Sequence, residues 1–472
     1  MSVLFCRVAI MKRTGPKTAG TMFGIDNDLI MTADKCVYQL IVAAPLVIPF
    51  SGIPIVPIGV GHLTVGRLYF SFVFAAFFLY ACSRRRCVRL EPIQAVSVVI
   101  LMAYGVLLAI SSFWAISLAR ALTYTVFYWW FAAFIAVALA SGADRLTLSR
   151  SVDLWSWSAL VVGVMCYFEL FHGIRFPGSR YYLDENPYFF HPTAVFHNEN
   201  DLAIYLAISS VFVVNRALRA SVAGKCLWAA ALVWFFVVIV ETSSQGGMLV
   251  YILGLFGYIA SHLVQKARRA TKLFATSLAI ILSILAVQYY DFYQASLEGL
   301  WRVSNPGSAR IALLQNASDA SAHNYGLGVG AGNAETFMEG RSNVRVLNVH
   351  NWMGEVLANT GVLGASLWLL LLGVILAGIT RAVRRDRGAA EWQRALIIVY
   401  LLFPLWQSVV SSMNQFMPFW VLLLYSLMST ADPKGKRLVG SRHDLERVGS
   451  RGSRSTCAYG DSVPKRSGCG GY

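Results

Sequence analysis

The sequence predicts an all-α polytopic membrane protein with about twelve transmembrane helices. Two polar loops lie outside the membrane, the larger between spans 9 and 10. Composition is the first indication, because 57% of the 472 residues are hydrophobic and only 14% are charged, whereas a soluble domain carries about 25% charged residues. The second indication is a series of apolar runs of roughly 17–25 residues, the length that crosses a bilayer as a helix.

These apolar runs fill the chain apart from the two tails and the two polar outer loops. The 36–60 region is the least regular because four prolines interrupt it, and a re-entrant segment is the alternative to a first span there. We expect spans at 36–52, 64–82, 93–112, 121–141, 154–172, 200–215, 226–241, 245–264, 273–290, 352–378, 394–411 and 416–430.

Basic residues gather in alternate loops and predict the orientation. The net charge is 40 − 24 = +16, which in a soluble protein would indicate nucleic acid. In a membrane protein the same excess marks the loops that stay in the cytoplasm, so no nucleic-acid partner is expected and both termini are predicted to be inside. The basic loops hold Arg84, Arg85, Arg86 and Arg89; Arg145 and Arg150; Arg216, Arg219 and Lys225; Lys266, Arg268, Arg269 and Lys272; and Arg381, Arg384, Arg385 and Arg387.

The chain therefore divides into five parts. We expect a cytoplasmic N-terminal tail over 1–35, spans 1–9 over 36–290 with an outer loop near 173–199, a large outer loop over 291–350, spans 10–12 over 351–430, and a basic disordered cytoplasmic tail over 431–472. The first 35 residues have no compact apolar core before a cleavage site, which favours a tail over a cleaved signal. The eight cysteines lie inside or within spans, so no disulfide is expected. No spacing indicates a metal site, and no cofactor is expected.

The larger outer loop carries the residues that we expect to do chemistry. His350 stands where this loop meets the long apolar run, and a histidine can accept a proton from a hydroxyl near neutral pH. Arg310, Arg341 and Arg345 share the loop, where the positive-inside rule gives no reason for them. Guanidinium groups bind phosphate in a bidentate manner. The structural alternative is that these arginines pair with Asp319, Glu335 or Glu339 in the same loop.

Two further segments have both a structural and a functional interpretation. Gly354, Gly361 and Gly364 favour close packing of a membrane helix, and the glycine-rich stretch Gly326–Asn333 favours a turn that folds the long loop back. Asn198 and Asn200 precede the span at 200–215, where Asn200 or Asp201 is expected to cap the helix or to contact sugar or phosphate.

The order of these motifs resembles the O-antigen ligase superfamily, which also includes O-antigen polymerases. His350-Asn351, then nine residues to Gly361 and two more to Gly364, is similar to the periplasmic signature of that family. The Asn198-Glu-Asn200 segment, Arg310 at the start of the long loop and the glycine-rich turn resemble the family in the same order.

The resemblance implies an inverting, metal-independent glycosyltransferase in the bacterial inner membrane. Its donor would be a glycan on undecaprenyl diphosphate, and its acceptor a saccharide hydroxyl, on lipid A–core for a ligase or on a growing chain for a polymerase, at the periplasmic face. His350 would accept the proton, and Arg310 would stabilise the leaving diphosphate. The substrate-binding residues implied are Arg175, Arg180, Gln245, Arg341, Arg345, Asn198, Asn200 and Asn351.

One position departs from the family pattern. Gln245 stands where the family often has an arginine after its seventh span, and an amide donates a hydrogen bond but brings no charge. Either Arg120, Arg175 or Arg180 supplies the cation, or the substrate differs, or the chain is an inactive assembly factor. A transporter of lipid-linked glycans is the alternative from another class, and it predicts charges at mid-span. The sequence does not decide between ligase and polymerase, nor does it give the oligomeric state.

Overall fold

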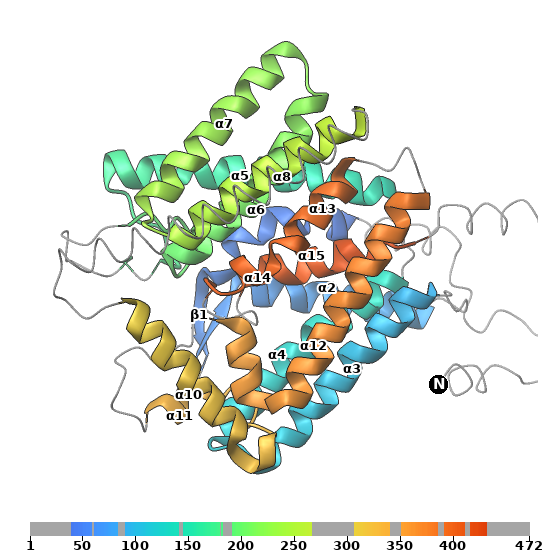
Figure 1. Ribbon diagram of the computed structural model, residues 1–472, viewed down its shortest axis with the longest axis vertical. Coiled ribbons are helices and arrows are strands. Elements are labelled where there is room, and N and C mark those ends of the chain that lie inside the picture. Colours follow the sequence, from blue (N-terminus) through green and yellow to red (C-terminus); the bar gives the residue numbers. More distant parts are fainter. Residues whose placement is uncertain are drawn as a thin grey trace, which may run out of the picture.

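The fold is described from a computed structural model of the chain. The structure describes residues 39–58, 61–83, 90–140, 145–179, 181–182, 191–266, 306–339, 351–385, 391–410 and 416–431. These residues are almost entirely helical, apart from one small hairpin (Figure 1). The prediction of a helical membrane protein is therefore confirmed in its class, and the structure adds a short antiparallel sheet.

Most predicted spans contain a helix in the described part of the chain. Six helices are long and apolar enough to cross a membrane, while two shorter apolar helices lie over Val65–Ala76 and Met417–Ser429. The long helices are α3 (Pro92–Ser111, continued by the 3₁₀ turn η3, Ser112–Trp114), α4 (Leu118–Ala140), α5 (Arg145–His172), α6 (Glu199–Arg219), α7 (Val222–Glu241) and α12 (Trp352–Arg385). The others in the span regions are α2 (Val65–Ser83), α8 (Gln245–Lys266), α13 (Glu391–Leu401), α14 (Phe403–Trp406) and α15 (Met417–Ser429).

The helices form two groups joined by α15. Helices α5 to α8 pack around α6, whose apolar stretch is 78% buried, whereas α2, α3, α4 and α12 pack together on the other side (Figure 1). Helix α15 contacts both groups, and all its residues from Met417 to Ser429 are buried. Its Trp420 ring stacks on Phe131 of α4 at a centroid distance of 4.8 Å. Aromatic packing at this junction holds the two groups together.

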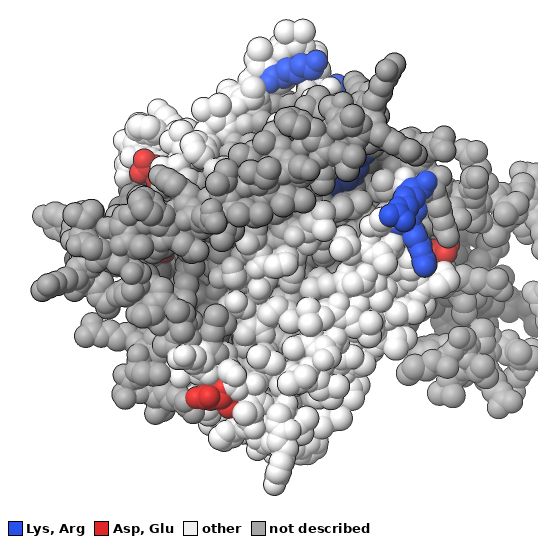
Figure 2. All heavy atoms as spheres, viewed as in Figure 1, with Lys and Arg blue, Asp and Glu red and all other residues white. Residues whose placement is uncertain are grey.

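The surface agrees with a bilayer environment. Where described atoms are visible in Figure 2, the face is mostly uncharged and its charged side chains lie at the margins. Such a surface would leave a large apolar area in water, and in a bilayer the same area faces lipid at no such cost.

Two predicted spans need correction, and the larger outer loop, whose fold the sequence left open, contains helices. The single span expected at 394–411 is broken into α13 and α14, because Pro404 lies at the start of α14 and cannot donate a helical hydrogen bond. After a helix over 39–47, the first predicted span turns into the 3₁₀ helix η2 (Pro49–Gly52) and the antiparallel strands β1 (Pro54–Ile58) and β2 (Gly61–Thr64). The larger outer loop contains two helices, α10 (Pro306–Gly326) and α11 (Ala334–Glu339). The span expected at 273–290 and the N-terminal tail lie outside the described residues. The C-terminal tail also lies outside them, except for its first residue, Ala431.

Candidate functional site

A polar cavity of about 650 Å³ lies where the first turns of α2, α4, α6, α12 and α15 meet. All these ends are predicted to face outside by the distribution of basic loops. The cavity is lined by Pro49, Ser51, Gly52, Thr64, Arg67, Ala119, Arg120, Thr123, Tyr124, Phe127, Gly178, Val195, Phe196, His197, Asp201, Gly332, Ala334, Glu335, Glu355, Asn359, Phe416, Met417 and Pro418. Its wall combines cations, carboxylates, amides and aromatic rings.

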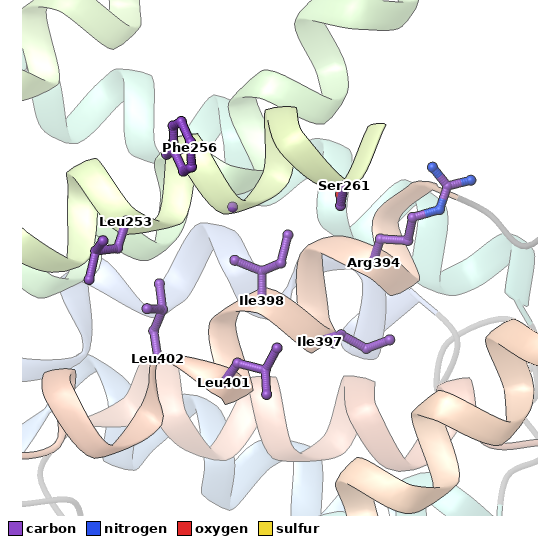
Figure 3. Close-up of a pocket in the computed structure, with 9 residues that line it drawn as sticks. Leu253, Phe256, Ser261, Arg394, Ile397, Ile398, Leu401 and Leu402 are labelled. Atoms are coloured by element: carbon purple, nitrogen blue, oxygen red, sulfur yellow. The ribbon is translucent and has the colours of Figure 1, made fainter. Parts of the chain in front are cut away.

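A second hollow of about 360 Å³ lies between α8 and α13 (Figure 3). Its walls are aliphatic and aromatic, with Arg394 at one end and Ser261 as a further polar residue. A site for a polar ligand or a reaction needs several converging polar groups. The polar cavity therefore is the better candidate for the functional site.

Two arginines line the polar cavity. Arg120, in the first turn of α4, pairs with Glu335 and Glu339 of α11 at N–O distances of 3.4 and 3.5 Å, and the side chains of this cluster are 45–47% exposed. Arg67, near the start of α2, places its guanidinium 4.4 Å from the centroid of the Phe127 ring. A guanidinium over an aromatic face is held there by a cation–π contact.

The wall formed by residues 191–197 is held by a buried carboxylate. Glu169 of α5 is 1% exposed, and its Oε2 accepts hydrogen bonds from the backbone N–H groups of Thr193 (3.1 Å) and Ala194 (2.6 Å). Ala194 has φ of +48°, so the chain turns sharply there. The Thr193 hydroxyl also donates to Ser179 Oγ at 2.6 Å. These bonds place Val195, Phe196 and His197 in the cavity wall.

The wall formed by the larger outer loop is held by glycines. Four glycines from Gly326 to Gly332 have positive φ, and this turn donates from Val329 N to Ala358 O (2.9 Å) and from Gly330 N to Asn359 O (3.0 Å). Those carbonyls precede a kink of α12 at Gly361, where φ is +64° and ψ is −162°. The turn expected at Gly326–Asn333 is confirmed. Gly361 lacks a side chain, so the backbone of α12 can lie directly against the backbone of this turn at Gly326.

Residues 230–369, which span α7 to the middle of α12, match a protein family described as O-antigen ligase. This segment of the chain is therefore similar to the O-antigen ligase family. The resemblance predicted from the motifs is thereby confirmed. The chain is also similar to the teichuronic acid biosynthesis protein TuaE of Bacillus subtilis (strain 168), at 32% identity over 189 residues. That alignment covers 36% of this chain and 38% of TuaE, well under half the length of the relative.

The match to the O-antigen ligase family and the apolar helices together indicate a multi-pass membrane protein. The matched segment includes the predicted positions Gln245, Arg310, Arg341, Arg345 and His350. The cavity, however, also draws on α2, α4 and the start of α6, which precede the matched segment. The site is thus shared between the matched segment and the N-terminal helices.

Several predicted site residues lie outside the described part of the chain. These are Arg180, Arg341, Arg345 and His350. Arg310 belongs to α10, but its side chain is not among those described. Position 350 directly precedes Asn351, which lies at the start of the helix that carries the cavity residues Glu355 and Asn359.

Other predicted residues have local structural roles and do not line the cavity. Asn198 is the N-cap of α6 and accepts from Asn200 N at 2.6 Å, so the cap is Asn198 and not Asn200 or Asp201 as expected. The observed cap differs from the predicted one because the helix already begins at Glu199, and Asn198 has the extended backbone that an N-cap needs. Asn351 Oδ1 accepts from Gly354 N at 2.9 Å and caps α12 in the same way.

Arg175 and Gln245 also lie away from the cavity wall. Arg175 donates from Nη1 to the Tyr181 carbonyl at 2.7 Å and so fixes the 175–181 turn. Gln245 is the first residue of α8. Of the cations proposed to replace the family arginine, Arg120 is the one that the described structure places in the cavity.

Sequence reasoning missed Arg67, Glu355 and Asn359. A signal existed for Arg67, because a basic residue at the outer end of a predicted span gains nothing from the positive-inside rule. Glu355 stood in the first turn of an apolar run, where an acidic residue also serves the helix dipole. Among the described residues no group of three His, Cys, Asp or Glu side chains could hold a metal ion.

Proposed function

We propose that this protein is a membrane glycosyltransferase of cell-surface polysaccharide biosynthesis. It moves a glycan from undecaprenyl diphosphate to a saccharide hydroxyl at the periplasmic face. The polar cavity supports this proposal most directly, because it joins cations, carboxylates, an amide and aromatic rings at one predicted outer face. The match to the O-antigen ligase family and the similarity to TuaE support the reaction class.

The proposed reaction is a single displacement. The acceptor hydroxyl oxygen attacks the anomeric carbon of the donor sugar, and the bond from that carbon to the diphosphate oxygen breaks. His350 takes the hydroxyl proton as general base, and undecaprenyl diphosphate leaves with the bonding electrons. One displacement at the anomeric carbon inverts its configuration.

Stabilising the leaving diphosphate is the main electrostatic task. Arg310 is the residue that the family resemblance assigns to it, with Arg341 and Arg345 in the same loop. The structure adds Arg120 and Arg67, which line the cavity on α4 and α2. Arg120 takes the place of the cation that Gln245 does not supply. Guanidinium groups in a site that excludes water stabilise negative charge on phosphate without a metal ion.

Surface polysaccharide resolved by size on a gel tests this proposal. A deletion strain would carry the intact gene, His350→Ala, or His323→Ala as a matched control. His323 belongs to the same outer loop, but it packs against the Phe337 ring and does not line the cavity. We expect the intact gene and His323→Ala to restore the wild-type pattern and His350→Ala to restore none. Rescue by His350→Ala would overturn the proposed mechanism.

The same gel separates ligase from polymerase. Polymer that stays on the lipid carrier in the deletion strain indicates a ligase, whereas single attached repeat units indicate a polymerase. A Gln245→Arg variant tests the assembly-factor alternative, because a large gain in transfer shows an enzyme weakened at this position. Normal polymer composition with lipid-linked glycan held inside the cell would indicate a transporter.

A further inference from the structure

The apolar hollow between α8 and α13 opens on the surface of the protein (Figure 3). Its volume is about 360 Å³. Leu401, on the α13 side, is 59% exposed, while Phe256 and Gly257 on the α8 side are half-buried. A recess with such walls is unfavourable in water, but within a bilayer the hydrocarbon chains of lipids fill it.

Gly257 forms the floor of this hollow. A Cβ atom built at Gly257 would lie 3.6 Å from Cγ2 of Ile398 on the opposite helix, which is an ordinary van der Waals contact. The backbone of α8 is therefore exposed to the hollow at this position, and a longer side chain there would take up the space. The opening thus depends on one residue that can be changed.

The length of the hollow matches one leaflet of a bilayer. It extends along α8 from Leu253 to Ser261, which is about 12 Å of helix at about 1.5 Å per residue. The hydrocarbon core of a bilayer is about 30 Å thick, so one leaflet accounts for about 15 Å. Ser261 lies close to Lys266, where α8 ends in a basic loop that is predicted to be cytoplasmic. The hollow therefore faces the predicted inner leaflet.

Arg394 marks the end of the hollow nearest this predicted cytoplasmic surface. Its aliphatic stem lies along the end of the hollow, and its guanidinium points away from the aliphatic walls (Figure 3). Glu391, one turn earlier on α13, pairs with His262 of α8 at 3.5 Å. Within the described ranges Arg394 has no ion pair. A long basic side chain at this depth places its charge among lipid headgroups, where a guanidinium binds phosphate.

We propose that this hollow binds one anionic phospholipid of the cytoplasmic leaflet. An acyl chain lies between α8 and α13, and the headgroup phosphate binds Arg394. The cytoplasmic leaflet is rich in anionic lipid, so its charge is complementary to the guanidinium. The bound lipid joins α8 to the first half of the span that is broken before Pro404.

The lipid carrier of the proposed reaction fits this hollow less well. Its diphosphate would lie in the polar cavity at the predicted outer face, whereas Arg394 lies near the predicted inner face. The phospholipid site is therefore separate from the proposed function, and either can fail without the other.

Native mass spectrometry of the purified full chain tests the site with three probes, namely phosphatidylglycerol, phosphatidylcholine and undecaprenyl diphosphate. Gly257→Leu fills the hollow, and Arg394→Gln removes the charge at its end. Gly373→Leu is the control for the first variant, because Gly373 is exposed on α12 and a Cβ there would meet nothing within 4 Å. Arg381→Gln is the control for the second, because Arg381 is exposed near the predicted cytoplasmic end of α12.

We expect the first lipid bound by the wild-type protein to be phosphatidylglycerol, with about 10-fold higher affinity than phosphatidylcholine, because the choline cation offsets the phosphate charge. Arg394→Gln removes this preference, and Gly257→Leu weakens the binding of both phospholipids. Phosphatidylglycerol also raises the unfolding temperature of the wild-type protein and of both controls, but not that of the two variants. If Gly257→Leu does not fold, Arg394→Gln decides alone.

Equal affinity of the wild-type protein for the two phospholipids would overturn the proposal, as would an unchanged preference in Arg394→Gln. Loss of undecaprenyl diphosphate binding in Gly257→Leu, with phosphatidylglycerol binding intact, would assign the hollow to the carrier instead. A change from two copies to one in Gly257→Leu, with lipid binding intact, would assign it to a second copy of the chain.

Discussion

Replacing Gly361 by alanine tests whether the contact between α12 and the glycine-rich turn holds the cavity wall in place. Gly361 has φ of +64° and ψ of −162°, a backbone conformation that is essentially confined to glycine. A Cβ atom built there would lie 1.8 Å from the carbonyl oxygen of Gly326 and 2.7 Å from its carbonyl carbon. Both obstacles are backbone atoms, so a side-chain rotation cannot relieve the clash.

The expected loss of stability follows from two contributions. Backbone strain at a residue other than glycine in this region costs about 1–3 kcal/mol. Relief of the clash requires the turn to move away, which breaks the bonds from Val329 N to Ala358 O and from Gly330 N to Asn359 O. At about 0.5–1.5 kcal/mol for each hydrogen bond, the total is about 2–6 kcal/mol.

Gly373→Ala is the matched control, because Gly373 lies on the same helix and a Cβ there would meet nothing within 4 Å. A glycine-to-alanine change inside a helix is neutral or gains up to about 1 kcal/mol. Thermal unfolding of both variants in nanodiscs, followed by tryptophan fluorescence, measures the difference. The reasoning is refuted if Gly361→Ala unfolds at the wild-type temperature and supports wild-type surface polysaccharide.

Three further predictions concern the other walls of the cavity. Glu169→Ala leaves two buried backbone N–H groups without their acceptor, so it should destabilise residues 191–197 by about 2–5 kcal/mol and abolish transfer. Glu169→Gln keeps an oxygen at this position, so it should retain more stability and more transfer. Thermal unfolding measures the stability, and the polysaccharide gel measures the transfer. Asn198→Ala removes the N-cap of α6 and should lower stability by about 1 kcal/mol with little change in donor affinity; a large loss of donor affinity at unchanged stability would show direct substrate contact. Arg120→Ala should weaken undecaprenyl diphosphate binding more than Arg120→Lys, and equal affinity in the alanine variant and wild type would remove Arg120 from the donor site.

The apolar runs predicted most of the helices because a bilayer requires long, uniformly apolar segments. The long run from Trp352 onward is α12, and the runs near 93, 121 and 200 are α3, α4 and α6. The orientation predicted from basic loops also places every wall of the polar cavity on one side, although no charge pattern was used to find the cavity. The orientation across the membrane stays a prediction.

Helix α10 was not predicted, although residues that become buried recur in its sequence at helical spacing. Leu313, Asn316, Ala317 and Ala320 recur at helical spacing and are buried against α12. Most of this face is small or polar, so the apolar signal is weak and a search for spans passes over it. The hairpin over Pro54–Thr64 was missed because its prolines argue against strands, and an isolated two-stranded edge tolerates them.

The composition of the cavity depends on contacts that a single sequence does not display. Arg67, Arg120 and Glu355 are separated by more than fifty residues each, and only tertiary packing places them in one wall. His350 and the glycine signature were accessible because they form one short continuous motif. Residues brought together from separate helices have no such local pattern.

The pairing of Arg120 with Glu335 and Glu339 has a consequence for turnover. A cation already neutralised by two carboxylates offers little to chloride or to a sugar hydroxyl, and only a ligand with several negative charges competes well for it. In the proposed reaction, the carrier diphosphate would displace these carboxylates from Arg120. Glu335 and Glu339 would then re-form their ion pairs with Arg120 as the product leaves, so a counter-ion belonging to the protein itself would assist product release.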